Sequence, residues 1–183
     1  MLAFLAATYL LLYYLRPTEW VPGLVGTPLL KVLGILSLIV IFQGAVTKKY
    51  PNVFAGQTER FMFGYMTSIL MSQIMHTYVD GAINSFNLFL PTLTGFLLVI
   101  CFIDSRHRLN FFLWFLIALT VFLAYEGWRQ YTTGFAHGGM EPFYQNALGA
   151  EGERIRLPRI RWYGVFNDPN DLGLALILVV PFL

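Results

Sequence analysis

The sequence is poor in charged residues and nearly lacks cysteine. Charged side chains make up 12% of its 183 residues, against roughly 25% in a typical soluble domain. The 57% share of hydrophobic residues and the mean hydropathy of +0.62 indicate an integral membrane protein and exclude an ordinary soluble globule. Cys101, the single cysteine, cannot form an internal disulfide, and its apolar surroundings predict a small core residue.

Signatures of several function classes are also missing. The sequence has no phosphate-binding glycine loop, no paired Cys or His spacing for zinc and no Gly-x-Ser-x-Gly elbow. A net charge of +2 is too small to predict nucleic-acid binding. The three histidines, His76, His107 and His137, are far apart in the sequence, so neither a metal site nor a cofactor is expected. We interpret His76 as a polar contact inside a helix bundle, and His137 is not expected to be catalytic because its glycine-rich segment offers no obvious orienting partner.

Apolar segments predict an all-α, polytopic transmembrane helix bundle of five to six spans, forming one domain over residues 1–183. Before the closing run they extend from Leu2 to Leu15, Leu29 to Val46, Phe61 to Val79, Phe86 to Ile103 and Leu109 to Tyr125. At 1.5 Å per residue the first covers only about 20 Å of a ~30 Å hydrocarbon core. The third is the least apolar and carries hydroxyl and amide side chains, which predicts a position inside the bundle.

The connections between these segments predict the orientation. Basic residues of two short connections fall on the same side: Lys48, Lys49, Arg60, Arg106 and Arg108. The positive-inside rule then places the N-terminus in the cytoplasm. It also places residues 126–163 outside the membrane as a loop, in which we expect a short surface helix from Phe143 to Ala150.

The first segment ends in Arg16-Pro17-Thr18-Glu19-Trp20. Proline breaks a helix, and tryptophan is typical of the membrane interface. Arg16 and Glu19 are close enough in sequence to pair across this turn, which we interpret as a structural contact.

Four arginines precede the last apolar run: Arg154, Arg156, Arg159 and Arg161. Their alternating spacing, interrupted by Pro158, predicts an extended segment with Arg159 and Arg161 on the same side. Guanidinium groups donate in pairs to phosphate oxygens, so the cluster favours an anionic ligand. A simple anchor for lipid headgroups is the alternative.

The next residues, Asn167-Asp168-Pro169-Asn170-Asp171, predict a turn that begins a helix. Asp168 or Asn170 is suited to cap that helix, whose N-terminal amides attract anions. The arginines and the helix N-terminus are thus predicted to face one anion from two sides. The alternative is that these residues only cap the helix.

The stretch from Arg161 through Gly164, Phe166 and Asn170 resembles the Arg-x-x-Gly-x-Phe-x-Asp/Asn-Pro-Asn pattern of the O-antigen ligase and polymerase family of bacterial envelope proteins. Arg16-Pro17-Thr18-Glu19-Trp20 also resembles the start of some members. The resemblance implies a multi-pass protein of the bacterial inner membrane, which transfers a glycan from a polyprenyl diphosphate to a periplasmic acceptor without a metal.

The same resemblance assigns roles to residues. It implies that Arg161 and Arg159 are catalytic, since they would hold the diphosphate and stabilise the leaving group. It implies that Asn167, Asp168 and Asn170 shape the turn beside them. Together with Arg154 and Arg156 of the arginine cluster, these three are the predicted substrate-binding residues. The expected partners are the polyprenyl-diphosphate-linked glycan, membrane lipid and other membrane subunits, with no nucleic acid.

Family members have more spans and a large outer loop after the motif, with a further arginine and a histidine thought to activate the acceptor. The sequence given ends at Leu183, within an apolar run. We therefore expect either the N-terminal half of a longer glycosyltransferase or a shortened, non-catalytic relative that serves as a structural subunit of a membrane complex. A transporter is disfavoured because no span carries the buried charges of a midplane site.

Overall fold

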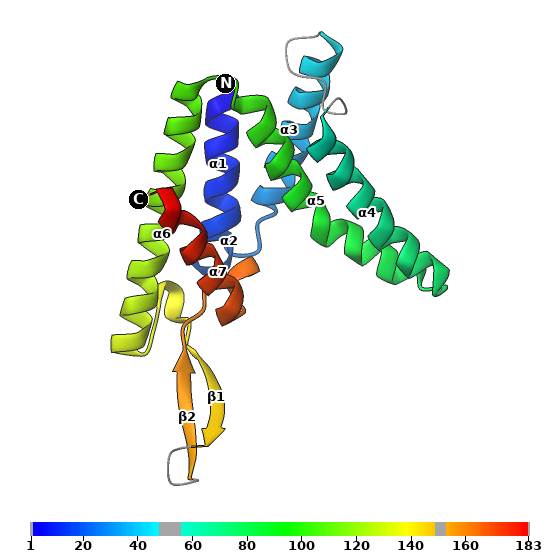
Figure 1. Cartoon of the computed structure of the whole chain (residues 1–183). Coiled ribbons are helices and arrows are strands. Elements are labelled where there is room, and N and C mark those ends of the chain that lie inside the picture. The colour runs from blue at the N-terminus through cyan, green and yellow to red at the C-terminus, as the bar shows by residue number, and fades with distance from the viewer. Residues whose placement is uncertain (1, 48–55, 149–152, 183) are drawn as a thin grey trace. The chain divides into compact units, whose positions relative to one another are not determined.

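The computed structural model of the chain describes residues 2–47, 56–148 and 153–182, and it is mostly helical (Figure 1). The described helices and strands are α1 (Leu2–Leu15), α2 (Pro17–Trp20), α3 (Leu29–Val46), α4 (Gln57–Met75), α5 (Val79–Phe102), α6 (Arg106–Thr133), β1 (Phe143–Leu148), β2 (Arg154–Arg159) and α7 (Pro169–Val179), with short 3-10 turns η1 (His137–Gly139), η2 (Gly164–Phe166) and η3 (Val180–Phe182). Contacts between Cα atoms group the chain into two compact units. The first comprises Met1–Leu10 with Pro28–Leu109, and the second Leu11–Thr27 with Asn110–Leu183.

Three helices are long and apolar enough to cross a membrane, namely α3, α5 and α6. Helix α1 and the stretch Pro169–Phe182 are apolar but shorter, and α4 has the length, at 19 residues, without the apolar character. The described residues therefore support three candidate spans where the sequence predicted five to six. Two predicted spans are not among the three: α4 carries too many polar side chains, and α1, at 14 residues, is too short.

Two helices agree with the predicted segments at both ends, and three do not. Helices α1 and α3 begin and end at the predicted residues. Helix α4 ends at Met75 rather than continuing to Val79, because Thr77 adopts a left-handed conformation with φ 56°. Helices α5 and α6 extend well beyond their apolar cores, since flanking polar residues continue the same backbone hydrogen bonds.

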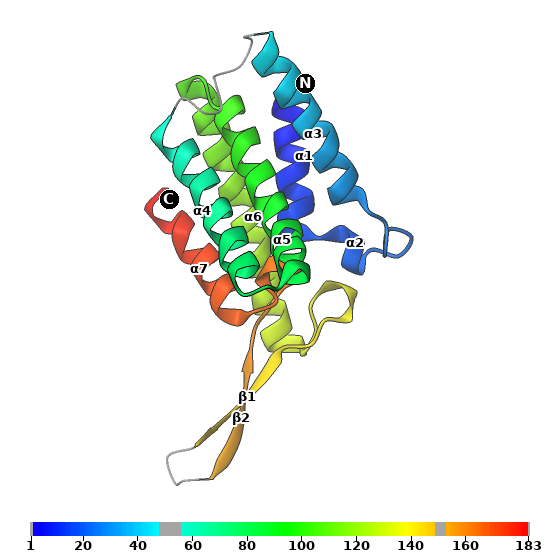
Figure 2. The same ribbon diagram turned by 90° about the vertical axis from the view of Figure 1, so that its right-hand side faces the viewer.

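In the first unit, α5 packs against both α3 and α4 (Figures 1 and 2). The fully buried ring of Tyr9 lies against Gly34 and Gly95, at 3.5 Å from the position that a Cβ would take on either glycine. Its hydroxyl donates to the carbonyl oxygen of Pro91 at 2.9 Å. Cys101 is buried at 3% exposure, which confirms the prediction of a core residue.

The prediction that the polar third segment lies inside the bundle is wrong. Helix α4 has no buried residue, and His76 is exposed at its end rather than in contact with the bundle. Thr67 and Ser68 donate to carbonyl oxygens one turn earlier in their own helix, those of Phe63 and Gly64. Hydroxyl groups satisfied in this way need no partner on another helix.

In the second unit, strands β1 and β2 form an antiparallel hairpin that extends away from the helices of this unit (Figure 2). Phe143 pairs with Arg159 and Leu148 with Arg154. The predicted surface helix from Phe143 is therefore wrong over the described residues up to Leu148, and the chain is not purely helical. The extended conformation predicted for the arginine-rich segment is confirmed for Arg154–Arg159. The predicted outer loop begins within α6, which continues to Thr133.

Candidate functional site

The first motif, Arg16-Pro17-Thr18-Glu19-Trp20, and the second motif, from Arg161 to Asn170, are far apart in the chain but meet in the second unit. Glu19 accepts a hydrogen bond from Arg16 Nη1 at 3.1 Å, which confirms the predicted pair. Its other carboxylate oxygen accepts from the backbone N–H of Gly164 at 3.2 Å. Gly164 has φ 65°, and a Cβ there would lie 2.5 Å from Arg16 Nε. A side chain at position 164 would therefore be strained and would collide with the first motif.

A buried aromatic cluster supports this contact. Trp162 is 1% exposed, and its ring lies edge-on to those of Trp20, Phe122 and Tyr163, with centroids 5.2–6.0 Å apart. Edge-to-face pairs at such distances are favourable beyond the area that they bury. Trp20 Nε1 also donates to the carbonyl oxygen of Leu15. The turn after α1 is thus held against the segment that leads into α7.

Arg159 and Arg161 both donate to the segment from Asn167 to Asn170, which comprises the turn before α7 and the start of that helix. Arg159 binds the amide oxygens of Gln145 at 2.9 Å and Asn170 at 2.8 Å. Arg161 binds the amide oxygen of Asn167 at 3.2 Å and the carbonyl oxygen of Glu141 at 3.0 Å. The structure thus brings the two arginines to the same turn, as the sequence predicted.

Neutral oxygens hold both guanidinium groups. Among the residues that the structure describes, neither Arg159 nor Arg161 has an ion pair with a carboxylate. These hydrogen bonds orient the two guanidinium groups, and no described carboxylate compensates their positive charge directly. Arg154 and Arg156 lie elsewhere, exposed on β2 toward the tip of the hairpin, and are not brought to the turn.

Asp168 is the N-cap of α7, as predicted. Its side chain accepts from the backbone N–H of Asn170 at 2.7 Å. The carboxylate of the protein itself therefore already occupies the amino end of this helix. The N-terminal amides of α7 are therefore less available to an anion than the sequence predicted. The two arginines remain the main component of the predicted anion site.

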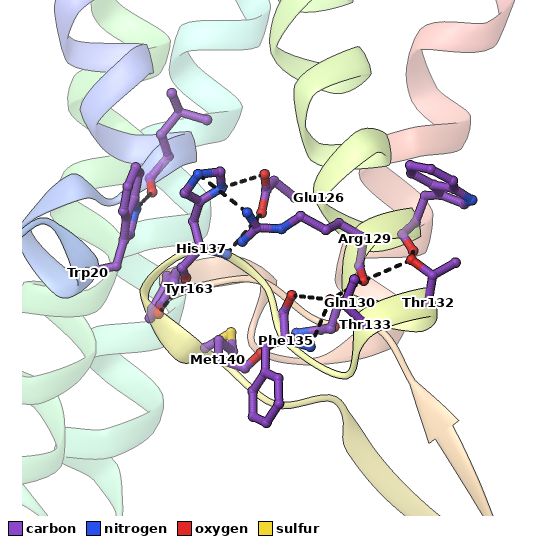
Figure 3. Close-up of polar contacts among 12 residues, drawn as sticks. Trp20, Glu126, Arg129, Gln130, Thr132, Thr133, Phe135, His137, Met140 and Tyr163 are labelled. Carbon is purple, nitrogen blue, oxygen red and sulfur yellow. Dashed lines mark hydrogen bonds and ion pairs between the residues drawn. The ribbon is translucent and has the colours of Figure 1, made fainter.

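A second polar cluster lies at the end of α6 (Figure 3). The side chain of Glu126 is fully buried, and its carboxylate accepts from the backbone N–H of His137 at 3.0 Å and lies 2.6 Å from His137 Nδ1. Arg129 Nη2 lies 3.3 Å from the same carboxylate, and Arg129 Nη1 lies 3.4 Å from His137 Nε2. The expectation that His137 has no orienting partner is wrong.

The sequence contained a signal for this cluster. Glu126 and Gln130 continue the buried stripe of Leu119 and Leu123 at helical spacing. An acidic residue on the buried face of a helix is expensive unless it has partners. That cost indicates a polar contact, although not which residue supplies it.

Gln130 connects this cluster to the arginines. It is fully buried, its Nε2 donates to the carbonyl oxygen of Met140, and its Oε1 accepts from the backbone N–H of Arg161. Tyr163 Oη donates to the carbonyl oxygen of His137 at 3.0 Å. Burial, and secondarily the negative charge of Glu19, raise the pKa of the Tyr163 phenol above 10, so Tyr163 stays a neutral donor.

Comparisons with protein-family models, curated proteins and solved structures found no match for this chain. Within the described ranges, no group of three or more His, Cys, Asp or Glu side chains could hold a metal ion.

Proposed function

We propose that this chain is a membrane glycosyltransferase-like protein, resembling the O-antigen ligases, that binds a polyprenyl-diphosphate-linked glycan through Arg161 and Arg159. The observation that carries the proposal is that, among the described residues, both guanidinium groups pair with neutral oxygens. Arginine is always charged at physiological pH, and its planar donors suit phosphate oxygens. Two oriented cations at one turn, without a carboxylate partner among the described residues, favour a ligand with two adjacent phosphates.

The same arrangement suits the chemistry of glycan transfer. When the sugar leaves its carrier, negative charge develops on the diphosphate. Fixed donors aimed at that charge lower the barrier without having to reorganise. The amide oxygens of Asn167 and Asn170 would keep the two guanidinium groups in place before the substrate arrives.

Binding of a polyprenyl diphosphate tests the proposal directly. Arg161→Ala should weaken binding to the purified chain in detergent by at least about 10-fold, because it removes a charged donor to the diphosphate. In native membranes it should slow glycan release from the carrier by about 100-fold, as loss of a transition-state donor does elsewhere. Calorimetry and a radiolabelled carrier measure the two effects.

Arg106→Ala is the matched control, since Arg106 is an exposed arginine at the opposite end of α6. It should leave both quantities unchanged. Wild-type protein that binds no polyprenyl diphosphate, or an Arg161→Ala variant with undiminished affinity, would contradict the proposal.

The proposal includes five to six spans in a bacterial inner membrane, with the N-terminus in the cytoplasm and residues 126–163 in the periplasm. Cysteines introduced at Asp80 and Arg156 should react with a membrane-impermeant maleimide in spheroplasts. A cysteine at His107 should react only after lysis. Native Cys101 is buried and gives a low background. Equal labelling of positions 107 and 156 in spheroplasts would refute a crossing by α6, and a protected position 80 would refute a crossing by α4.

A further inference from the structure

We infer that Glu19 of the first motif, oriented by Arg16, positions the guanidinium group of Arg161. This inference rests on the proposed function, to which it adds two positioning residues. It stands on a continuous chain of hydrogen bonds, on the backbone conformation of Arg16 and on the way in which the charge of Glu19 is balanced.

Hydrogen bonds lead from Glu19 to Arg161 in three steps. Glu19 Oε2 accepts from the backbone N–H of Gly164 at 3.2 Å. The carbonyl oxygen of Gly164 accepts from the backbone N–H of Asn167 at 3.3 Å. The side-chain amide oxygen of Asn167 then accepts from Arg161 Nη1 at 3.2 Å. A displacement of Gly164 would therefore move the residue that orients the guanidinium group.

The segment that carries these contacts is a compact turn. The backbone N–H of Trp162 donates to the carbonyl oxygen of Phe166 at 2.8 Å, with Gly164 midway between the two residues. The ring of Phe166 lies against that of Tyr14 at the end of α1, with centroids 5.3 Å apart. Aromatic packing thus holds the turn beside the first motif, and the hydrogen bond from Gly164 to Glu19 fixes the centre of the turn.

The backbone of Arg16 is in the left-handed region, with φ 49° and ψ 50°. Residues other than glycine rarely adopt this conformation. Arg16 Nε is buried and has no hydrogen-bond partner among the described residues. Strain of this kind persists only where other contacts hold the residue, and it is concentrated at functional sites. The conformation therefore points to a role for the Arg16 side chain where it lies, against Gly164 and Glu19.

The two oxygens of Glu19 have separate partners. Oε1 pairs with Arg16 Nη1 at 3.1 Å, and Oε2 binds the N–H of Gly164. A carboxylate bound to Arg161 itself would neutralise the cation that the diphosphate needs. Because Arg16 balances the charge of Glu19, the pair can hold the turn while the charge of Arg161 stays available to phosphate.

Glu19→Gln separates positioning from stability. Its amide oxygen can accept from Gly164 or from Arg16, but its amide nitrogen can accept from neither. The ion pair is partly exposed, at 25% and 37% of the two side chains, so the thermal unfolding midpoint in detergent should fall by a few degrees at most. Glycan release in native membranes should slow about 10-fold, because the turn that orients Arg161 shifts. Release at the wild-type rate would overturn the inference.

A double-mutant cycle shows whether Glu19 acts through Arg161. When Arg161→Ala is already present, adding Glu19→Gln should slow glycan release by less than about 2-fold further, because the positioned group is gone. A further loss of about 10-fold would mean that the two residues act independently and would overturn the inference.

Asp104→Asn is the matched control, since it removes the carboxylate of an ion pair with Arg108 in the other unit. It should leave glycan release unchanged. A loss equal to that of Glu19→Gln would show that removing any ion pair slows release, which would also overturn the inference.

Hydrogen exchange tests the contact independently of the carrier. Glu19→Ala removes the acceptor of the Gly164 N–H outright, so peptides that cover residues 163–167 of the purified protein should lose protection. Mass spectrometry follows the exchange, and protection equal to that of the wild type would overturn the inference. Wild-type protein that binds no polyprenyl diphosphate would instead overturn the proposed function.

Discussion

Replacing Trp162 with alanine is expected to lower the stability of the second unit by about 3–5 kcal/mol, the usual cost of removing a large aromatic side chain from a core. Trp162 is 1% exposed and contacts the rings of Trp20, Phe122 and Tyr163. Alanine would leave a cavity where the first motif, α6 and the segment before α7 meet. The thermal unfolding midpoint of the protein in detergent should fall by several degrees, because each 1 kcal/mol moves the midpoint of a domain of this size by roughly 2–4 °C.

Two variants show whether packing is the cause. Trp162→Phe keeps most of the ring and should cost much less, because the indole Nε1 has no hydrogen-bond partner among the described residues. Trp114→Ala removes the same side chain from a position of α6 that is 70% exposed, and it should leave the midpoint nearly unchanged. Equal losses for Trp162→Ala and Trp114→Ala would show that burial of Trp162 contributes nothing particular.

The sequence predicted helices well where apolar runs end at strong breakers. Pro17 lies two residues after Leu15, and Pro28 directly precedes Leu29, so the end of α1 and the start of α3 were visible in the sequence. Helix α5 begins well before its apolar run because its first turns contain polar residues that hydropathy alone does not count as helical. The hairpin was missed because strand pairing depends on two segments at once, and only the arginine-rich partner has a clear alternating pattern.

The candidate site was predictable only where its contacts join residues that are close in the sequence. Asp168 caps a helix within its own turn, and Arg161 contacts Asn167 only six residues away, so local patterns were sufficient. Glu126 and His137 meet only because α6 ends and the chain folds back on itself. Gly138 and Gly139 belong to the glycine-rich segment in which the sequence indicated no orienting partner for His137. In the structure they allow the turn that brings His137 to a buried carboxylate.

Those two glycines provide the last prediction. Both have positive φ, 73° at Gly138 and 79° at Gly139, so alanine at either position would incur backbone strain of about 1–2 kcal/mol. A Cβ on Gly138 would also lie 2.4 Å from Trp20 Cβ and 2.5 Å from Tyr163 Oη, whereas a Cβ on Gly139 would meet no atom of the described residues within 4 Å. The position of Trp20 Cβ is set by its backbone and does not change when the side chain rotates. Relieving the clash with Trp20 Cβ therefore requires the backbone of Trp20 or of the turn to move.

Gly138→Ala should therefore destabilise the protein by about 1–3 kcal/mol more than Gly139→Ala, the range found for overpacking. Thermal unfolding in detergent measures the difference, and both variants share the strain term, so their comparison isolates the clash. Equal stabilities for the two variants would mean that the turn does not lie against Trp20 and Tyr163. In that case Trp20 of the first motif would not contact the turn that carries His137.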